Sequence, residues 1–305
     1  WNTRSSFFPY TTMISHLKIN PADNVAVAIT ELKKGTVVNV EGQEVVLQED
    51  VPAGHKFALK NFAKGEDVIK YGYPIGHAIE DAVAGAWMSD KNIKTNLAGL
   101  LEYTYDPQLE EVTAPDQGLT FKGYVRKNGD VGIRNEIWII PTVGCVNDVA
   151  KALVKENQDL VSGSVDGLYA FPHPFGCSQT GEDHAQTRKL LAALVRHPNA
   201  GAVLVVSLGC ENLTQEQFLE ELGDFDPNRV KFMVCQKTED EMAEGRAILE
   251  ECAAFAKKFQ REEIPASELV IGMKCGGSDG LSGITANPVV GRFSDMLVAQ
   301  GGSTV

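Results

Sequence analysis

The strongest constraint on the fold is the alternation of apolar runs and helical patterns after about residue 120. Strand-type runs at 138–140, 203–206 and 232–234 are each followed by a segment with apolar residues at helical spacing. Two of these segments open on capping-box patterns, at 214–217 and 238–241. Strands that alternate with helices predict a parallel sheet with helices on both faces.

The first part of the chain has a different pattern. Short apolar runs at 25–29, 36–38 and 67–69 are typical of strands, and turns ending in glycine separate such runs. Glycine supplies the positive φ that these turns require. We therefore expect a small all-β domain at 13–105, preceded by a tail at 1–12. A Pro- and Gly-containing linker is predicted at 106–120, ahead of the α/β domain at 121–262.

A further region is expected at 263–305. It opens on the strand-type run 269–271 and contains Asn287-Pro288, a pattern that favours a helix start. A strand begins again where the chain stops, so we expect the native protein to continue past Val305.

Composition limits the partners and the location. The formal net charge is −13 at pH 7, which argues against nucleic acid and anionic membranes, since both attract clustered Lys and Arg. A small anionic substrate needs only local donors and stays compatible. There is no apolar run of the roughly 18 residues that span a bilayer, and no signal-peptide pattern. A cytoplasmic protein is expected, with homo-oligomerisation left open.

Four of the six cysteines share one setting. Each of these four follows an apolar run, and the first three come directly after glycine: Cys145, Cys177, Cys210 and Cys275. Ligands of open α/β sheets bind outside the carboxyl ends of the strands, and thiolates bind soft or borderline metals. The alternative is that these cysteines fill the core, the role assigned to Cys235 and Cys252.

Two histidines are candidates for proton transfer or ligation. His173 lies four residues before Cys177 on a loop bounded by prolines, so both side chains could approach one ion. The alternative is a loop histidine held by hydrogen bonds. In the β domain His55 follows the turn residue Gly54, and it is a weaker candidate because a lone histidine is usually solvated.

The segment 275–283 is the densest local signal, with four glycines in nine residues. Its backbone N–H groups could form an anion-binding nest, and a sugar-acid carboxylate with its hydroxyls would be a suitable guest. The residues expected to bind substrate here are Gly276, Gly277, Ser278, Asp279, Thr285 and Asn287. A flexible connector is the alternative.

Arg134 and Asn135 are also candidate substrate ligands. They precede the strand-type run at 138–140, so they lie at its start and away from the carboxyl edge. For this reason a structural role at a domain joint is slightly favoured over contact with substrate.

Motifs along nearly the whole chain resemble those of the altronate/galactarate dehydratase family. In the β domain they are DNVAVA (23–28), GHKFAL (54–59) and VIKYG (68–72). In the α/β domain they are NGDVGIRNE (128–136), PTVGCVN (141–147), FGCSQ (175–179) and LGCEN (208–212). The longest and most specific is KCGGSDGLSGITANP (274–288).

The resemblance implies a SAF-type β-clip domain followed by a Rossmann- or flavodoxin-like parallel α/β domain and the start of a catalytic C-terminal domain. It also implies dehydration of D-altronate to 2-dehydro-3-deoxy-D-gluconate in hexuronate breakdown. The implied cofactor is a divalent metal, iron(II) first and manganese second, with the four strand-end cysteines as candidate ligands.

Other functions stay open at this point. The substrate could be galactarate or a related sugar acid. Three of the four cysteines could instead hold an iron–sulfur cluster. A third interpretation is a fragment that binds a sugar acid or a partner without turnover.

Overall fold

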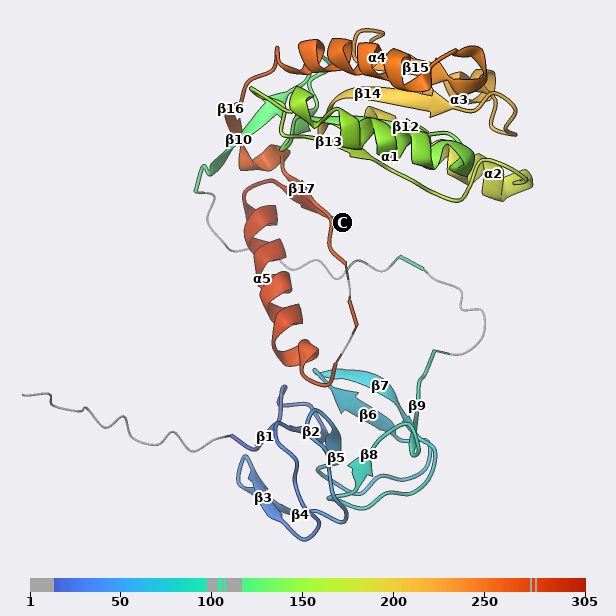
Figure 1. The fold of residues 1–305 in the computed structure, drawn as a ribbon. Coiled ribbons are helices and arrows are strands. Elements are labelled where there is room, and N and C mark those ends of the chain that lie inside the picture. Colours follow the sequence, from blue (N-terminus) through green and yellow to red (C-terminus); the bar gives the residue numbers. More distant parts are fainter. Residues whose placement is uncertain (1–13, 98–103, 106, 108–116, 275, 278) are drawn as a thin grey trace, which may run out of the picture. The chain divides into compact units, whose positions relative to one another are not determined.

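The computed structural model describes residues 14–97, 104–105, 107, 117–274, 276–277 and 279–305 (Figure 1). The predicted tail, most of the predicted linker, Cys275 and Ser278 lie outside the described residues. The chain divides into two compact units: Trp1–Ala114 with Gly272–Met296, and Pro115–Ile271 with Leu297–Val305. Each unit is treated by itself below.

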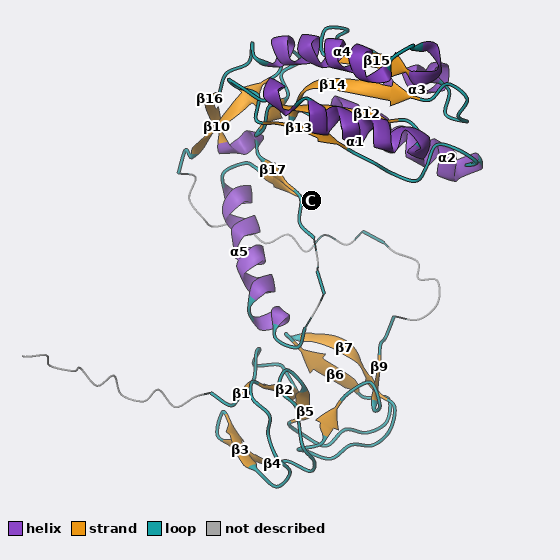
Figure 2. Cartoon of the chain, in the orientation of Figure 1, coloured by secondary structure: helices purple, strands orange, loops and turns teal. Residues whose placement is uncertain are grey.

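The second unit is built on a parallel sheet of four strands (Figure 2). The strands are β12 (Glu136–Pro141), β13 (Gly167–Ala170), β14 (Ala200–Ser207) and β15 (Val230–Val234). Their order is β13-β12-β14-β15, and each neighbouring pair is parallel. The first strand thus lies between the second and the third, as in doubly wound folds. The predicted mixed α/β architecture with a parallel sheet is confirmed.

Helices cover both faces of this sheet. They are α1 (Asn147–Glu156), α2 (Gly181–Arg196), α3 (Gln215–Leu222) and α4 (Glu241–Ala256). Alternate side chains of β12 enter two cores: Ile137 and Ile139 pack with residues of α1 and α4, while Trp138 and Ile140 pack with residues of α2 and α3. Burial on both faces explains why these strands are apolar runs without polar alternation.

Short 3₁₀ segments connect these elements: η1 (Gly144–Val146), η2 (Gln158–Leu160), η3 (Cys235–Lys237) and η4 (Ala266–Glu268). The predicted capping box at 214–217 is present in both directions at the start of α3. The one predicted at 238–241 is wrong. Asp240 caps α4 by accepting from the N–H groups of Met242 and Ala243, and Thr238 instead ends η3.

An antiparallel sheet at the edge of this unit was not predicted. It consists of β10 (Thr120–Val125), β11 (Val131–Gly132) and β16 (Glu262–Pro265), in the order β11-β10-β16. Because β16 pairs with β10, the compact unit continues past the predicted boundary at residue 262 to Ile271. A pairing of strands about 140 residues apart leaves no local signal in the sequence.

The described part of the β domain contains nine short strands. They are β1 (His16–Leu17), β2 (Val25–Ala28), β3 (Val37–Val40), β4 (Gln43–Val46), β5 (Lys56–Ala58), β6 (Asp67–Lys70), β7 (Tyr73–Ala78), β8 (Trp87–Met88) and β9 (Ile93–Lys94). They form sheets β1-β2-β5-β8 and β6-β7-β9 and the hairpin β3-β4, all antiparallel. The all-β expectation is confirmed.

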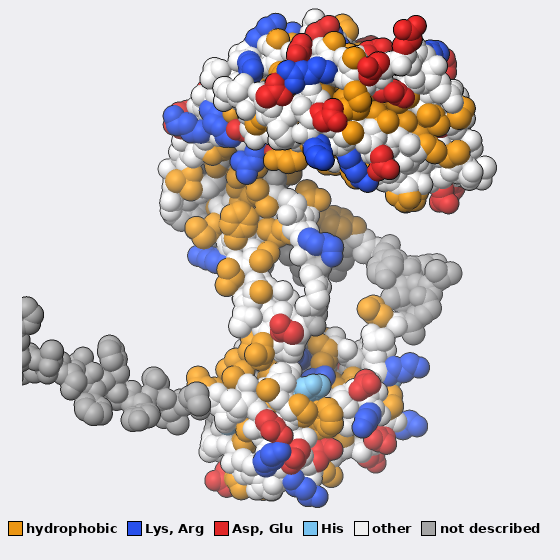
Figure 3. All heavy atoms as spheres, in the orientation of Figure 1, with side chains coloured by type: hydrophobic (Ala, Val, Ile, Leu, Met, Phe, Trp, Pro, Cys, Tyr) orange, Lys and Arg blue, Asp and Glu red, His pale blue; other side chains and the backbone are white. Residues whose placement is uncertain are grey.

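The last part of the chain contains η5 (Ser282–Ile284), α5 (Ala286–Ala299) and a parallel pair, β17 (Val270–Ile271) with β18 (Ser303–Thr304). The helix starts at Ala286, two residues before Pro288, the predicted first helical residue. None of the helices among the described residues is long and apolar enough to cross a membrane. On the visible face of the α/β unit, acidic and basic side chains are interspersed with apolar ones (Figure 3).

Candidate functional site

Three cysteines follow the carboxyl ends of neighbouring strands in the parallel sheet. Cys145 lies in η1 after β12, Cys177 lies in the loop after β13, and Cys210 follows β14. All three are exposed. Since β13, β12 and β14 are neighbours in the sheet, the three thiols occupy one edge, at and beside the point where the strand order reverses. The predicted shared position is confirmed for these three, and Cys275 lies outside the described residues.

The glycines before these cysteines serve the packing of one loop on another. A Cβ on Gly176, whose φ is +95°, would lie 2.1 Å from the carbonyl oxygen of Thr142. A Cβ on Gly144 would lie 2.8 Å from the carbonyl oxygen of His173. The two turns are further joined by a 2.9 Å bond from the Gly144 N–H to the Phe175 carbonyl. Glycine is therefore required there even without a ligand.

His173 is held by hydrogen bonds on both ring nitrogens. Its Nε2 lies 2.8 Å from the carbonyl oxygen of Pro141, and its Nδ1 accepts from the N–H of Phe175 at 3.2 Å. With Nδ1 as the acceptor, Nε2 is the donor to the Pro141 carbonyl. The geometry favours the alternative of a loop histidine that joins the turns after β12 and β13. Its predicted role in proton transfer has no free ring nitrogen to act through.

Glu211 is a site residue that the sequence interpretation missed. Its carboxylate is buried and accepts from Thr142 Oγ1 (2.7 Å), the Leu208 N–H (3.1 Å) and the Gly209 N–H (2.6 Å). Burial raises the pKa of Glu211, but the hydrogen bonds from Gly209, Thr142 and Leu208 outweigh it and hold the pKa below its usual value. Glu211 thereby ties the Cys210 turn to the end of β12 as a fixed anion.

A small hollow of about 160 Å³ adjoins this network, with Ser207, Glu211, Thr214 and Lys237 in its lining. The signal that could have found Glu211 is its place directly after Gly209-Cys210, at a strand end. A carboxylate in a tight turn there has backbone N–H groups within reach.

The donors do not converge on one point. Among the described residues there is no group of three or more His, Cys, Asp or Glu side chains that could hold a metal ion. Cys145, Cys177 and Cys210 share an edge of the sheet without forming a ligand cage. Their role as metal ligands stays a prediction.

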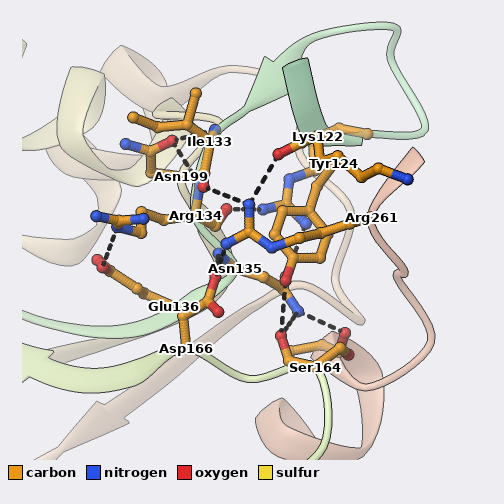
Figure 4. Close-up of polar contacts among 12 residues, drawn as sticks. Lys122, Tyr124, Ile133, Arg134, Asn135, Glu136, Ser164, Asp166, Asn199 and Arg261 are labelled. Carbon is orange, nitrogen blue, oxygen red and sulfur yellow. Dashed lines mark hydrogen bonds and ion pairs between the residues drawn. The ribbon is translucent and has the colours of Figure 1, made fainter. Parts of the chain in front are cut away.

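Asn135 is the centre of a buried polar network at the opposite end of β12 (Figure 4). Its Oδ1 accepts from the Arg126 guanidinium at 2.8 Å, and its Nδ2 donates to the carbonyl oxygens of Ser164 and Ala256 at 2.9 and 3.0 Å. The side chain is 0% exposed, so it has no surface for a substrate. The structural interpretation of Asn135 is favoured.

Arg134 differs from its neighbour. Its side chain is 56% exposed and lies 4.0 Å from Glu136 Oε1, a loose ion pair (Figure 4). Its backbone takes part in the surrounding hydrogen bonds: the carbonyl accepts from Arg126 and the N–H donates to Asn199 Oδ1 at 3.3 Å. The guanidinium is accessible to a ligand, but at the end of the strand away from the cysteines.

In the β-domain unit, two predicted segments lie against each other. A Cβ on Gly54 would be 3.1 Å from the Cα of Gly280, so the glycine-rich segment packs on the turn that holds His55. His55 is exposed, and its Nδ1 accepts from the indole N–H of Trp87 at 3.3 Å. No partner of its Nε2 is found among the described residues. The structure thus brings two candidates together that are over 200 residues apart in sequence.

Elsewhere in the glycine-rich segment, Asp279 is exposed, while Leu281, Ser282 and Gly283 are half-buried. Asp279 Oδ1 accepts from the N–H groups of Leu281 and Ser282, both at 2.8 Å, and so initiates η5. The Thr285 hydroxyl donates to the Leu281 carbonyl. Gly276, Gly277 and Asn287 are exposed. These contacts give Asp279 and Thr285 a structural task, and substrate binding by the set stays a prediction.

The other two cysteines belong to the core, as predicted. Cys235 and Cys252 are buried, and both pack in the cluster formed with α1 and α4. Burial raises the pKa of the Cys252 thiol to about 12 and also raises that of Cys235. Both thiols are therefore protonated at neutral pH in this apolar setting, which suits a packing role.

Comparison with protein families adds to this geometry. Residues 14–96 match the altronate/galactarate dehydratase SAF domain, and residues 123–257 match the second domain of D-galactarate dehydratase/altronate hydrolase. Residues 266–305 match the D-galactarate/altronate dehydratase C-terminal model. The chain belongs to the altronate/galactarate dehydratase family. The SAF assignment, made first from motifs in the β domain, is confirmed.

Individual relatives agree with the family. Altronate dehydratase of Escherichia coli (strain K12) is 50% identical over 296 residues, and that of Bacillus subtilis (strain 168) is 47% identical over 297. Galactarate dehydratase (L-threo-forming) of E. coli is 34% identical over 311 residues. These alignments cover 95–96% of this chain and 58–59% of the relatives. The chain thus spans little more than half of their length.

Proposed function

We propose that this protein is a sugar-acid dehydratase that converts D-altronate to 2-dehydro-3-deoxy-D-gluconate and water. The observation that carries the proposal is the identity of 50% over 296 residues to an altronate dehydratase, which includes both regions of candidate site residues. Galactarate is the second candidate substrate, supported by the lower identity of 34% to a galactarate dehydratase.

The chemistry needs a base and an acid. The base removes the proton from the carbon next to the carboxylate, and the hydroxyl on the following carbon leaves as water after it is protonated. The resulting enol then takes up a proton at that following carbon to give the 2-keto acid. Of the two predicted histidines, His55 is better suited to proton transfer, because it is exposed and its Nε2 has no partner among the described residues.

A divalent metal, iron(II) or manganese, is part of the proposal as a cofactor. When bound, such an ion would hold the substrate carboxylate and stabilise the negative charge that develops beside it. The described residues do not by themselves form a ligand cage for such an ion. Metal content after anaerobic purification tests this part, and abundant acid-labile sulfide would favour the iron–sulfur alternative instead.

The test of the function is formation of a 2-keto acid, measured as its semicarbazone, from altronate, galactarate and mannonate with Fe²⁺ or Mn²⁺ present. Altronate is expected to be the best substrate, and His55→Asn is expected to lower kcat by about 100-fold or more. Calorimetric binding of altronate without turnover would support the binding-fragment alternative. The absence of both binding and turnover with all three acids would contradict the proposal.

A further inference from the structure

A second cavity lies at the amino end of the parallel sheet, within the α/β unit. Its volume is about 350 Å³, which is in the range of small-molecule sites. Its lining includes Arg126 from the turn between β10 and β11, Pro198 just before β14, and Arg229 just before β15. The three strand-end cysteines follow the opposite ends of the strands. The cavity is therefore separate from the carboxyl edge.

Two guanidinium groups in this lining have no carboxylate partner. Arg126 is 6% exposed and donates to the carbonyl oxygens of Pro198 and Arg134 and to Asn135 Oδ1. Arg229 donates from Nε and Nη2 to the carbonyl oxygens of Ala200 and His197. All these acceptors are neutral, and neither arginine forms an ion pair within the described part of the chain.

The local electrostatics make this arrangement costly. Burial and the nearby charge of Arg229 together lower the pKa of Arg126 to about 10, with a partial offset from Asp166. Burial likewise lowers the pKa of Arg229, and the charges of Asp130 and Asp226 offset only part of this effect. A buried charge without a carboxylate in direct contact is unfavourable, and carbonyl groups compensate only part of that cost. An anion bound in the cavity next to Arg126 and Arg229 would offset the desolvation of the two guanidinium groups and the repulsion between them.

Donors are available to such an anion. Nη1 of Arg229 has no acceptor among the described residues, while Nε and Nη2 are used. Of the three carboxylates in the lining, Asp226 is already paired with Lys127 at 2.8 Å, and Asp130 accepts from Asn128. With Arg196 the lining holds four cationic side chains against three carboxylates, in a chain whose net charge is −13.

The remaining walls are apolar and aromatic. Phe225, Phe255 and Phe259 line the cavity with Leu222, Val195 and Val230. Phe225 is 37% exposed, so its ring is partly accessible from solvent. A polyhydroxylated sugar acid would leave its hydroxyl groups unpaired against these walls. The cavity instead suits a ligand with one anionic group and one flat apolar group.

We propose that this cavity binds a small aromatic organic anion, with the anionic group at Arg229 and Arg126 and the ring against the phenylalanines. The site is distinct from the proposed dehydration site, and neither assignment depends on the other. A carboxylate and a phosphate present the same recognition chemistry here, and the probes below separate them.

The test is calorimetry on the 305-residue chain with four probes: phenyl phosphate, benzoate, inorganic phosphate and uncharged benzyl alcohol. Phenyl phosphate or benzoate is expected to bind at least about tenfold more tightly than inorganic phosphate and benzyl alcohol, because only the first two use both the cations and the rings. The better of the two identifies the anionic group. Absence of saturable binding of both at millimolar concentration would overturn the proposal.

Variants then locate the binding. Arg229→Gln is expected to weaken the aromatic anion about tenfold or more. Phe225→Ala is expected to weaken it several-fold and to leave inorganic phosphate unchanged. Arg188→Gln is the matched control, because Arg188 pairs with Glu221 outside this lining. If circular dichroism shows that Arg229→Gln does not fold, Phe225→Ala decides alone. Equal affinity in the wild type and in the folded cavity variants would place the ligand elsewhere and overturn the proposal.

Discussion

The two ends of the parallel sheet use polar residues in opposite ways. At the amino end, Asn135 and Arg126 are buried, and their polar groups form hydrogen bonds with backbone carbonyls and with each other. At the carboxyl end, Cys145, Cys177 and Cys210 are exposed on turns shaped by glycine. The amino end thus uses buried polar groups to tie the chain together beside the proposed cavity, and the carboxyl end presents thiols to solvent.

The difference shows how position within one sheet separates stability from chemistry. Helices α1 and α2 follow the carboxyl ends of β12 and β13, so the connecting turns meet at that edge and expose what they carry. At the amino end, β11 and two loops lead into β12, β13 and β14. Hydrogen bonds hold these preceding segments to one another. Glu211 is the exception at the carboxyl end, since it is buried and structural beside exposed thiols.

The largest effect is expected for Asn135→Leu. The substitution removes three buried hydrogen bonds, one from Arg126 Nη1 and one each to the Ser164 and Ala256 carbonyls, and it is expected to cost about 4 kcal/mol in the free energy of unfolding. Urea denaturation measures it. Asn128→Ala, in an exposed turn, is the control and should stay within about 0.5 kcal/mol. Equally small losses of unfolding free energy in both variants would contradict the role of Asn135 as the centre of the buried polar network.

The second prediction compares the thiols. In the native protein Cys145, Cys177 and Cys210 are expected to react with a disulfide reagent at pH 8 at least about 100-fold faster than Cys235 and Cys252, which are buried and have raised pKa values. Mass spectrometry of digested, time-quenched samples gives the rate for each residue. Labelling of Cys252 as fast as Cys177 would show that the core opens readily.

The third prediction concerns Glu211→Gln. An amide cannot accept from all three donors at once, so the variant is expected to lose about 2 kcal/mol in the free energy of unfolding at pH 7. Because the pKa of Glu211 is lowered in the folded state, its contribution is present above the unfolded value near 4.5 and is lost as the pH falls through the folded pKa. The difference between wild type and variant should therefore shrink below about pH 4.5. A difference that is constant from pH 7 to pH 3 would contradict this account.

The smallest effect on stability is expected for Arg134→Ala. Its ion pair with Glu136 is loose and largely exposed, so the free energy of unfolding should change by less than about 0.5 kcal/mol. Steady-state kinetics with altronate gives the second readout. A rise in KM at unchanged stability would support substrate contact by Arg134, whereas unchanged kinetics would remove it from the site.

Much of the α/β unit could be predicted because its signals are local. The apolar runs of β12, β14 and β15 and the capping box of α3 are readable from neighbouring residues. The second capping box failed for a local reason as well: Thr238 and Asp240 are both good cap residues, and η3 extends the chain so that the helix starts after the second. The pairing of β16 with β10 was missed, because it depends on residues far apart in the chain.

The candidate site was predicted less well than the fold. The shared edge of the three cysteines follows from strand direction alone, and strand direction can be predicted from the sequence pattern. The hydrogen-bond partners of each side chain cannot be predicted in this way. His173 has the residue type and spacing of a ligand, yet its ring nitrogens bind Pro141 and Phe175, contacts that exist only after the turns have packed.

The sequence by itself determined the family, the order of the all-β and α/β parts and the cysteines that follow strand ends, because these depend on local pattern and chain direction. Only the tertiary structure decided which polar groups are buried or occupied by hydrogen bonds within the protein. It buried Asn135 and Glu211, occupied both nitrogens of His173 and placed Gly280 against Gly54. Hydrogen-bond saturation and burial arise between distant segments, so the same residue type can be structural at one position and available for chemistry at another.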